Sequence, residues 1–380
     1  MKAVIAIDSF KGSLSSIGAS EAISFGIRDV FPDAEIITAP IADGGEGTVE
    51  AIIAGSGGEY RTVSVSNPLG KRVEAVYGVL PDGTAVIEMA SAAGITLVSD
   101  EGRDPMLYDT YGVGEMMLDA IKSGAKKLVI GIGGSATNDG GVGMLRALGF
   151  AFLDKDGKDI GRGAESLSKL CKIDTAGIDL LIKNCKITVA CDVKNPLTGE
   201  NGATYIYGPQ KGVTPEMKPL LDGYLKRYAD LTREVIPDAD PDAVGAGAAG
   251  GLGFALISYL GAELRPGIEI VTELNSLSEK VADADIVITG EGRMDAQSAM
   301  GKAPVGVARV AKRYGKPVIA FSGAATDDAS LLREHGIDAV FPIARGPISL
   351  ADAMNKAVAS KNMRLTAREV FSLIRTLGLK

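Results

Sequence analysis

Lys127-Leu128-Val129-Ile130-Gly131-Ile132, a mainly apolar run, leads directly into the loop Gly133-Gly134-Ser135-Ala136-Thr137-Asn138-Asp139-Gly140-Gly141. The run predicts a buried strand, and a helix is expected to begin around Val142. Glycine lets the backbone turn sharply and approach a ligand, and the free N–H groups before a helix attract an anion. This stretch therefore predicts an α/β fold with an anion site in the loop.

Strands and helices alternate at both ends of the chain, as is typical of a parallel α/β sheet. Strands are expected over Lys2–Asp8, Glu35–Ala39, Asp285–Thr289, Pro317–Phe321 and Ala339–Pro342, and helices over Ser16–Phe31, from about Thr48, and over Val305–Tyr314. Thr366 and Glu369 have the spacing of a capping box, which predicts that a terminal helix begins there.

The middle of the chain has a different pattern. Arg61–Ser66, Lys71–Val79 and Thr84–Met89 alternate apolar and polar residues and are joined by short turns rich in Gly, Pro, Asn and Asp, as in β-hairpins. An antiparallel segment within an α/β chain predicts an inserted domain. We expect one α/β domain over 1–60 and 270–380, and an inserted mixed α/β domain over 61–269.

The composition excludes several classes of protein. With 46% hydrophobic and 23% charged residues among 380, the chain can bury the cores of about two domains. Its net charge of −8 argues against a nucleic-acid or anionic-membrane partner. Ala243–Ala262 has no charge, but its six glycines predict a turn and a buried helix rather than a membrane span. We expect a cytoplasmic monomer or homodimer.

The cysteines and the histidine limit the chemistry further. Cys171, Cys185 and Cys191 match no zinc pattern and are expected to be buried thiols in a reducing compartment. His335 is the only histidine, so a histidine-rich metal site is excluded. Because a glycine follows it, we expect His335 at the end of a helix.

Two hypotheses for the glycine-rich loop after Ile132 stay open. In the first, the loop is a phosphate cradle with Ser135, Thr137 and Asn138 as added donors. In the second, Gly131-x-Gly133-x-x-Ala136 is a loose dinucleotide fingerprint, with Phe150–Leu153 as the next strand and Asp154 after it. A second glycine-rich run, Gly245-x-Gly247-x-x-Gly250-Gly251-x-Gly253, lacks a preceding strand but leaves another helix N-terminus for phosphate oxygens.

Acidic residues follow four of the predicted strands, each near a glycine or in a short loop. The four segments are Asp8-Ser9-Phe10-Lys11-Gly12, Asp43-Gly44-Gly45-Glu46-Gly47-Thr48, Ala190-Cys191-Asp192-Val193 and Thr289-Gly290-Glu291-Gly292-Arg293-Met294-Asp295. Ligands of open α/β sheets bind at the carboxyl ends of strands, so we expect one shared site. Such carboxylates can hold Mg²⁺ together with phosphates and water.

Taken together and in order, these loops resemble those of the bacterial glycerate kinase family, type I. The matching stretches are the segments that begin at Asp8, Ala42, Gly133, Cys191, Gly208 and Gly247, and Thr289–Gly292 with Asp295 and Gln297. The resemblance implies a Rossmann- or flavodoxin-like domain plus an inserted domain, with the active site between them. It also implies phosphorylation of D-glycerate by ATP with Mg²⁺, giving 2-phosphoglycerate. A 3-phosphoglycerate-forming kinase and an NAD(P)-dependent hydroxy-acid oxidoreductase remain as alternatives.

The residues themselves suggest the following roles. Asp192 accepts the proton of the substrate hydroxyl, Lys11 neutralises the transferred phosphoryl group, and Asp43 assists both chemistry and metal binding. Asp295 is the second metal ligand. The substrate is expected to contact Arg293, Lys211 and Asp8. The nucleotide is expected to contact Gly133, Gly134, Ser135, Thr137, Asn138, Gly250 and Gly251.

Overall fold

The computed structural model describes residues 1–178, 180–295, 298 and 302–378, and the chain divides into two compact units. The first unit contains Met1–Asp43, Glu50–Gly57 and Ile268–Lys380, and the second contains Gly44–Val49 and Gly58–Gly267. Gln297, one of the residues that carry the resemblance, lies outside the described residues.

The first unit is built on a five-stranded parallel sheet in the order β13-β12-β11-β1-β2. Its strands are β1 (Lys2–Ile5), β2 (Glu35–Thr38), β11 (Ile286–Met294), β12 (Val318–Ala325) and β13 (Ala339–Pro342). The chain builds the sheet outward in opposite directions from β1 and β11. The carboxyl ends of these two central strands therefore form the switch point at which doubly wound sheets bind ligands.

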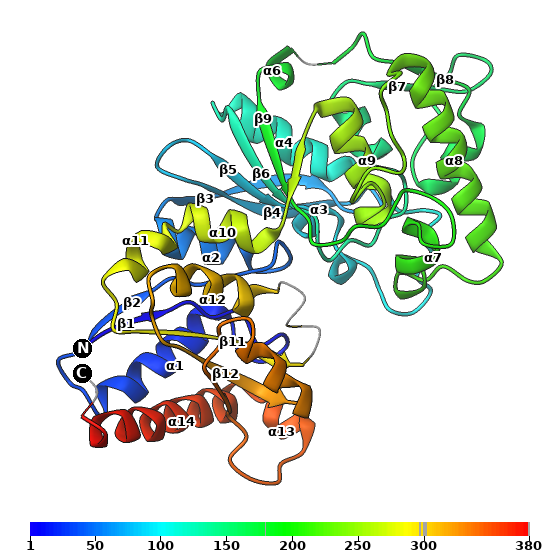
Figure 1. Cartoon of the computed structure of the whole chain (residues 1–380). Coiled ribbons are helices and arrows are strands. Elements are labelled where there is room, and N and C mark those ends of the chain that lie inside the picture. Colours follow the sequence, from blue (N-terminus) through cyan, green and yellow to red (C-terminus); the bar gives the residue numbers. More distant parts are fainter. Residues whose placement is uncertain (179, 296–297, 299–301, 379–380) are drawn as a thin grey trace. The chain divides into compact units, whose positions relative to one another are not determined.

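Helices cover both faces of this sheet (Figure 1). α1 (Ser16–Arg28) and α14 (Lys356–Thr376) lie together on one face, and α10 (Gly267–Leu274), α11 (Leu277–Ala282) and α12 (Ala303–Arg313) lie on the other. α1 and α14 cross closely at Gly26. A side chain at this position would collide with the backbone of Arg364, so the close crossing requires glycine. The remaining helices of this part of the chain are α2 (Thr48–Ser56), α13 (Leu350–Met354) and the 3₁₀ helix η5 (Asp327–Arg333).

The expected start of the terminal helix is wrong. α14 begins at Lys356, and the Asn355 side chain caps it by accepting bonds from the N–H groups of Ala357 (3.0 Å) and Val358 (3.3 Å). Thr366 and Glu369 therefore lie inside the helix. Asn355 is as strong a cap as threonine, and the buried stripe from Ala359 onward packs the earlier turns, so the longer helix forms.

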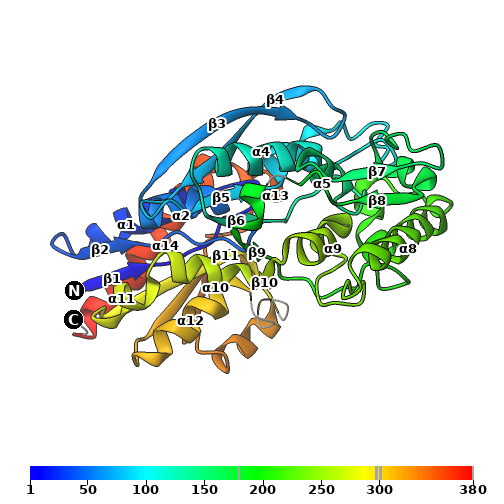
Figure 2. The same cartoon turned by 90° about the horizontal axis from the view of Figure 1, so that it is seen from above.

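The second unit contains a six-stranded mixed sheet in the order β10-β9-β6-β5-β4-β3. Its strands are β3 (Glu59–Ser66), β4 (Arg72–Val79), β5 (Ala85–Glu88), β6 (Lys127–Gly131), β9 (Lys186–Ala190) and β10 (Glu263–Arg265). β3, β4 and β5 pair antiparallel, as their alternation predicts, whereas β5, β6, β9 and β10 are parallel. Figure 2 shows the long β3–β4 pair running beside α4. The α/β class with a parallel and a mixed sheet is confirmed.

The second unit also contains ten short or long helices and a small third sheet among its described residues. They are α3 (Ala90–Ala93), η1 (Ile95–Leu97), α4 (Tyr111–Lys122), α5 (Val142–Ala147), η2 (Ala164–Lys169), α6 (Leu180–Lys183), α7 (Ala203–Tyr207), η3 (Pro209–Lys211), α8 (Met217–Val235) and α9 (Ala248–Leu260). β7 (Ala151–Leu153) and β8 (Lys172–Asp174) form an antiparallel sheet of their own.

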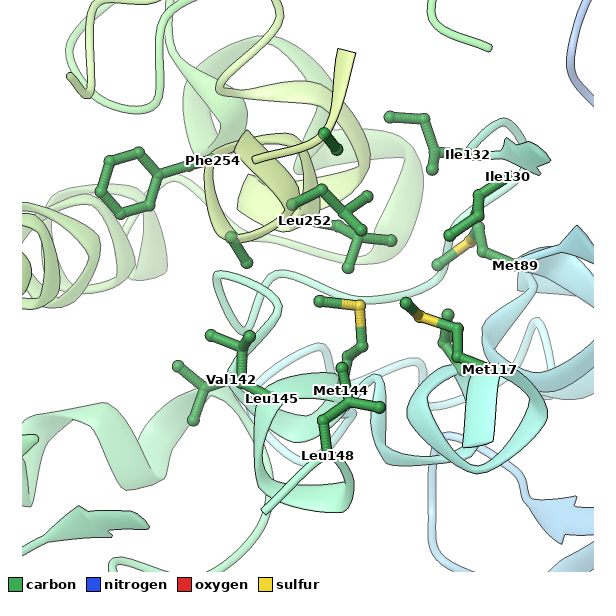
Figure 3. Close-up of a cluster of buried hydrophobic side chains, with 14 of the residues drawn as sticks. Met89, Met117, Ile130, Ile132, Val142, Met144, Leu145, Leu148, Leu252 and Phe254 are labelled. Atoms are coloured by element: carbon green, nitrogen blue, oxygen red, sulfur yellow. The ribbon is translucent and has the colours of Figure 1, made fainter. Parts of the chain in front are cut away.

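The helices that follow both glycine-rich loops share one hydrophobic core (Figure 3). Met144 and Leu145 of α5, and Leu148 just after it, pack in the same cluster as Leu252 and Phe254 of α9. Ile130 and Ile132 from β6 and its end, with Met89 and Met117, belong to the same cluster. Burial of these apolar side chains fixes both loops on a rigid base.

Three smaller expectations have mixed outcomes. In the part of the chain that the structure describes, no helix is long and apolar enough to cross a membrane, and Ala243–Ala262 contains the buried helix α9. All three cysteines are free, but Cys171 is exposed and the other two are half-buried, so the expected burial is wrong for Cys171. It lies just before β8 at the edge of the small hairpin, where little packs over it. His335 is exposed and lies two residues after η5.

Candidate active site

The first unit gathers charged side chains at the carboxyl ends of β1, β2 and β11. We name Asp8, Lys11, Asp43 and Glu291 the acid cluster. The Asp8 N–H donates to the Gly290 carbonyl (3.0 Å), which places Asp8 beside the residue that precedes Glu291. The Lys11 ammonium lies 3.1 Å from Asp43 Oδ2. Asp8 and Lys11, which come from one predicted segment, and Asp43, which comes from another, are therefore neighbours, as the expected shared site requires.

The ionisable groups of the acid cluster have shifted pKa values. Burial raises the pKa of Asp8 from 3.8 to about 7, and the nearby carboxylates of Asp43 and Glu291 add to this against the opposing effect of Lys11. Burial also raises the pKa of Glu291. For Lys11, burial alone would lower the pKa, but Asp43, Asp8 and Glu291 raise it above its usual value. The lysine is thus firmly cationic among three carboxyl groups.

Arg293 and Asp295 extend this group along β11. Arg293 Nε lies 3.2 Å from Asp295 Oδ2, and the arginine side chain is 69% exposed, so it is accessible to an anion. The Ser298 hydroxyl donates to Glu291 Oε1 (2.6 Å). Glu291 and Ser298 were not singled out as site residues from the sequence. The position of Glu291 between two glycines at a strand end was the available signal.

In the second unit, the loop Gly133–Gly141 follows β6; Gly134 is exposed, and Ser135–Gly141 are buried. Asn138 Nδ2 donates to the Thr204 hydroxyl (2.9 Å) of α7, and the Gly134 carbonyl accepts the N–H of Ile95 (2.9 Å). Thr137 Oγ1 and Asn138 Oδ1 are buried and have no hydrogen-bond partner within the described residues. Buried polar atoms of this kind are rare unless a ligand or water completes them.

The second glycine-rich loop, Gly247–Gly253, packs directly on the first. Ala249, Gly250 and Gly251 are consecutive left-handed residues, with φ of 51°, 70° and 92°. A side chain at Gly250 would collide with the Thr137 carbonyl and come within 2.7 Å of Asn138 Cα, and the Gly250 carbonyl accepts the Gly140 N–H (2.9 Å). We name these two loops the glycine-loop pair. Successive left-handed residues before a helix point N–H groups into a common concavity that suits an anion.

Asp192 lies after β9 in the second unit. Its Oδ1 accepts the N–H of Gly267 (2.9 Å), and the residue is exposed. The Gly44 carbonyl accepts the Gly133 N–H (3.4 Å), and a side chain at Gly44 would lie 2.8 Å from Ala190 Cβ. The residue that follows Asp43 in the chain is therefore packed against the ends of β6 and β9.

Lys211 is placed differently from what the sequence suggested. Its side chain is only 1% exposed, and the ammonium donates to the Thr137 carbonyl (2.7 Å). Burial lowers the pKa of Lys211 to about 7, although Asp139 opposes this shift. A glycine-flanked lysine in a turn indicated an exposed cation, because the sequence gives no sign of the loop that covers it.

The dinucleotide hypothesis loses its structural basis. β7, the strand expected to follow the fingerprint, pairs with β8 in a separate sheet and is not a neighbour of β6. Asp154, the candidate ribose ligand, accepts the N–H groups of Asp156 (2.8 Å) and Lys158 (2.9 Å) and closes a turn. A dinucleotide fold requires the second strand beside the first, so this interpretation is wrong.

The family model described as "Glycerate kinase family" matches residues 3–375. The chain belongs to the glycerate kinase family. A relative named glycerate 2-kinase from Escherichia coli K12 is 50% identical over 96% of this chain and 98% of its own length. The glycerate kinase of Bacillus subtilis is 48% identical over 99% of this chain and 98% of its own length. The crystal structure of a "putative glycerate kinase 2" from Salmonella typhimurium LT2 is 48% identical, with a TM-score of 0.89 over 100% of this chain and 99% of that one. The chain is therefore an enzyme, a kinase of a small molecule.

The contact at Gly250 predicts a strong effect of the smallest possible side chain. Gly250→Ala adds a methyl group in a left-handed conformation, at a cost of roughly 1–2 kcal/mol, and forces Thr137 to move. We expect a lower urea midpoint. The matched control is Gly223→Ala in α8, where nothing lies within 4 Å. That variant should be neutral or more stable by about 0.5–1 kcal/mol; equal effects of the two substitutions would contradict the packing argument.

The raised pKa of Asp8 predicts a pH-dependent penalty in stability. The folded-state pKa of about 7 exceeds the ordinary 3.8. The favourable contribution of Asp8 to folding stability is therefore fully present below pH 3.8 and is lost as the pH rises toward 7. The Asp8→Asn variant lacks the buried charge. At pH 8 its free energy of unfolding should exceed that of the wild type by roughly 2–4 kcal/mol. The advantage should shrink steadily toward pH 5. Thermal melts at both pH values measure it, and an advantage that does not depend on pH would contradict this account.

Proposed function

We propose that this enzyme transfers the γ-phosphoryl group of ATP to the 2-hydroxyl of D-glycerate, giving 2-phosphoglycerate. Its relatives are named glycerate kinases, and one of them glycerate 2-kinase, at about half identity over nearly the whole chain. The observation that carries the nucleotide assignment is the glycine-loop pair, in which three consecutive left-handed residues interrupt the first turn of α9. We also propose a cytoplasmic enzyme, which agrees with three free thiols.

The glycine-loop pair is proposed to bind the nucleotide phosphates. Backbone N–H groups of Gly134, Gly250 and Gly251 would donate to phosphate oxygens, and the helix dipole of α9 would favour their negative charge. Gly133, whose N–H donates to the Gly44 carbonyl, would let the loop approach the phosphates without a side chain in the way. The side chains of Ser135, Thr137 and Asn138 add hydroxyl and amide groups to the loop. Two of these, Thr137 Oγ1 and Asn138 Oδ1, still lack partners within the described residues, so a ligand or an ordered water can complete them.

The carboxylates of the first unit fit a magnesium ion. Mg²⁺ prefers hard oxygen donors and is usually bound by one or two carboxylates together with phosphate and water. Asp43 is 34% and Asp295 20% exposed at the side chain, so both can reach a ligand. Across the described ranges, no group of three or more His, Cys, Asp or Glu residues could hold an ion by itself. Asp43 and Asp295 would hold Mg²⁺, which when bound would neutralise phosphate charge.

The remaining groups would act on the acceptor. Asp192 would accept the proton of the reacting hydroxyl, and Lys11 would stabilise the charge of the transferred group. Arg293 would bind the substrate carboxylate, because its guanidinium is exposed and suited to a planar anion. Asp8 would accept a bond from a substrate hydroxyl. Lys211, which is buried under Thr137, is no longer proposed to contact the substrate.

Phosphorus NMR of the reaction with ATP, Mg²⁺ and D-glycerate tests the proposed function. In 2-phosphoglycerate the phosphorus couples to one proton and gives a doublet, whereas the 3-phosphate couples to two protons and gives a triplet. We expect ADP and the doublet. A triplet would move the reaction to the primary hydroxyl, and no product that depends on both ATP and glycerate would refute the proposal.

Asp192→Asn tests the proposed base. The amide oxygen can still accept the Gly267 N–H, so the fold should be kept, but the amide cannot take a proton. Turnover should fall by roughly a hundredfold or more. Asp240→Asn is the control, because Asp240 is also exposed and also caps a backbone N–H, that of Asp242 (2.9 Å). Turnover of Asp192→Asn equal to that of the control would remove Asp192 from the mechanism.

Lys11→Ala tests the proposed cation. Turnover should fall more than ATP affinity does, because the charge matters most when the phosphoryl group is in transfer. The control is Lys127→Ala, since Lys127 forms an exposed ion pair of the same 3.1 Å length with Asp82. Steady-state kinetics with both substrates varied separate the effects. A change confined to the KM of glycerate would reassign Lys11 to substrate binding.

A further inference from the structure

We infer that Lys211 and Asp139 are positioning residues that hold the glycine-loop pair in the arrangement that binds nucleotide phosphates. The inference rests on the proposed function, because it takes that loop pair as the ATP site. Neither residue is proposed to touch ATP or glycerate. Each would act through the backbone of the loop that it supports.

Lys211 supports the loop from the buried side. The residue ends η3, and the turn around it is closed by bonds from Lys211 N–H to the Gly208 carbonyl (2.8 Å) and from Gly212 N–H to that of Pro209 (3.1 Å). Its ammonium donates to the Thr137 carbonyl at 2.7 Å. Lysine is almost never fully buried without a specific partner, and here the partner is the Thr137 carbonyl of the glycine-rich loop.

Asp139 fixes the same loop from the other end. Its carboxylate is 1% exposed and accepts bonds from the Thr110 N–H (2.9 Å), the Thr110 hydroxyl (2.8 Å) and the N–H groups of Gly141 (3.2 Å) and Gly143 (3.0 Å). The Thr110 hydroxyl in turn accepts the Met144 N–H (2.9 Å). One carboxylate therefore ties the loop to the start of α4 and the first turn of α5.

The two supports converge on the contact with the second loop. Gly250 lies against the carbonyl of Thr137, the group that Lys211 binds, and its own carbonyl accepts the N–H of Gly140, the residue after Asp139. A shift of Thr137 would therefore move Gly250 and its neighbouring N–H groups. The supports control the geometry of both loops, although neither lies in the second one.

The charges of the two residues also depend on each other. Burial lowers the pKa of Lys211, and the negative charge of Asp139 opposes this effect. Other charges nearby are already paired: Arg162 makes two 2.7 Å bonds to Asp109, and Arg103 of the segment against Gly212 pairs with Asp100. Because both residues hold the same loop and Asp139 also acts on the Lys211 charge, the two substitutions should not be additive.

Lys211→Met tests the inference, because methionine keeps the apolar stem and removes the ammonium. We expect the dissociation constant for ATP with Mg²⁺, measured by titration calorimetry, to rise at least tenfold, while the KM of glycerate stays within twofold. The matched control is Lys280→Met. Lys280 also donates to a backbone carbonyl, that of Gly55 (2.7 Å), and burial also lowers its pKa, but it belongs to the first unit. ATP binding by the control should stay within twofold of wild type.

The double variant Lys211→Met/Asp139→Asn completes a double-mutant cycle with the two single variants. In the Asp139→Asn background, Lys211→Met should weaken ATP binding at least threefold less than in the wild type. If circular dichroism shows that Lys211→Met is unfolded, Asp139→Asn alone and Lys211→Arg take its place. The first should bind ATP at least fivefold more weakly, and the second, which keeps the charge, within threefold of wild type.

The outcomes separate the inference from the proposed function. A folded Lys211→Met that melts at a lower temperature but binds ATP like the wild type would overturn the inference and leave the function intact. Equal losses for ATP and glycerate would also overturn it, because they indicate a general loss of structure. If the wild type itself does not bind ATP, both the proposed function and the inference are wrong.

Discussion

The backbone contact between Gly250 and Thr137 is the constraint on which the candidate nucleotide site depends. Two peptide segments approach so closely that no side chain fits between them, and three left-handed residues in succession are needed to bring the second segment there. Such a contact buries many polar groups, which must be paired. Asp139 and Lys211 supply that pairing from outside the contact, and the shared apolar core of α5 and α9 keeps it rigid.

The first unit follows a different principle. Its acid cluster places Asp8, Asp43 and Glu291 around one lysine at the switch point of a doubly wound sheet. Burial and mutual repulsion raise the pKa of Asp8 to about 7, which costs stability at neutral pH. Carboxyl groups that repel one another in this way destabilise the fold. Active sites commonly trade stability for function, so the acid cluster indicates a site for a cationic or hydroxyl-bearing ligand.

Much of the fold follows from local patterns. Ala339–Pro342 is a strand with the bounds expected, because a short apolar run between polar loops leaves little choice. The start of α14 was missed because Thr366 and Glu369 match a cap locally, while Asn355 caps the helix that packing selects. The site was predicted in part: Asp8, Lys11 and Asp43 were expected together because parallel strands end at one edge. The burial of Lys211, the tie made by Asp139 and the Ser298–Glu291 bond depend on tertiary neighbours that spacing alone does not give.

The central claim is that the glycine-loop pair binds the nucleotide phosphates. The most direct measurement is a crystal structure of the enzyme with a non-hydrolysable ATP analogue, Mg²⁺ and D-glycerate. The account predicts phosphate oxygens within hydrogen-bond distance of N–H groups from both Gly133–Gly141 and Gly247–Gly253. A triphosphate bound elsewhere, with both loops free of it, would contradict the account.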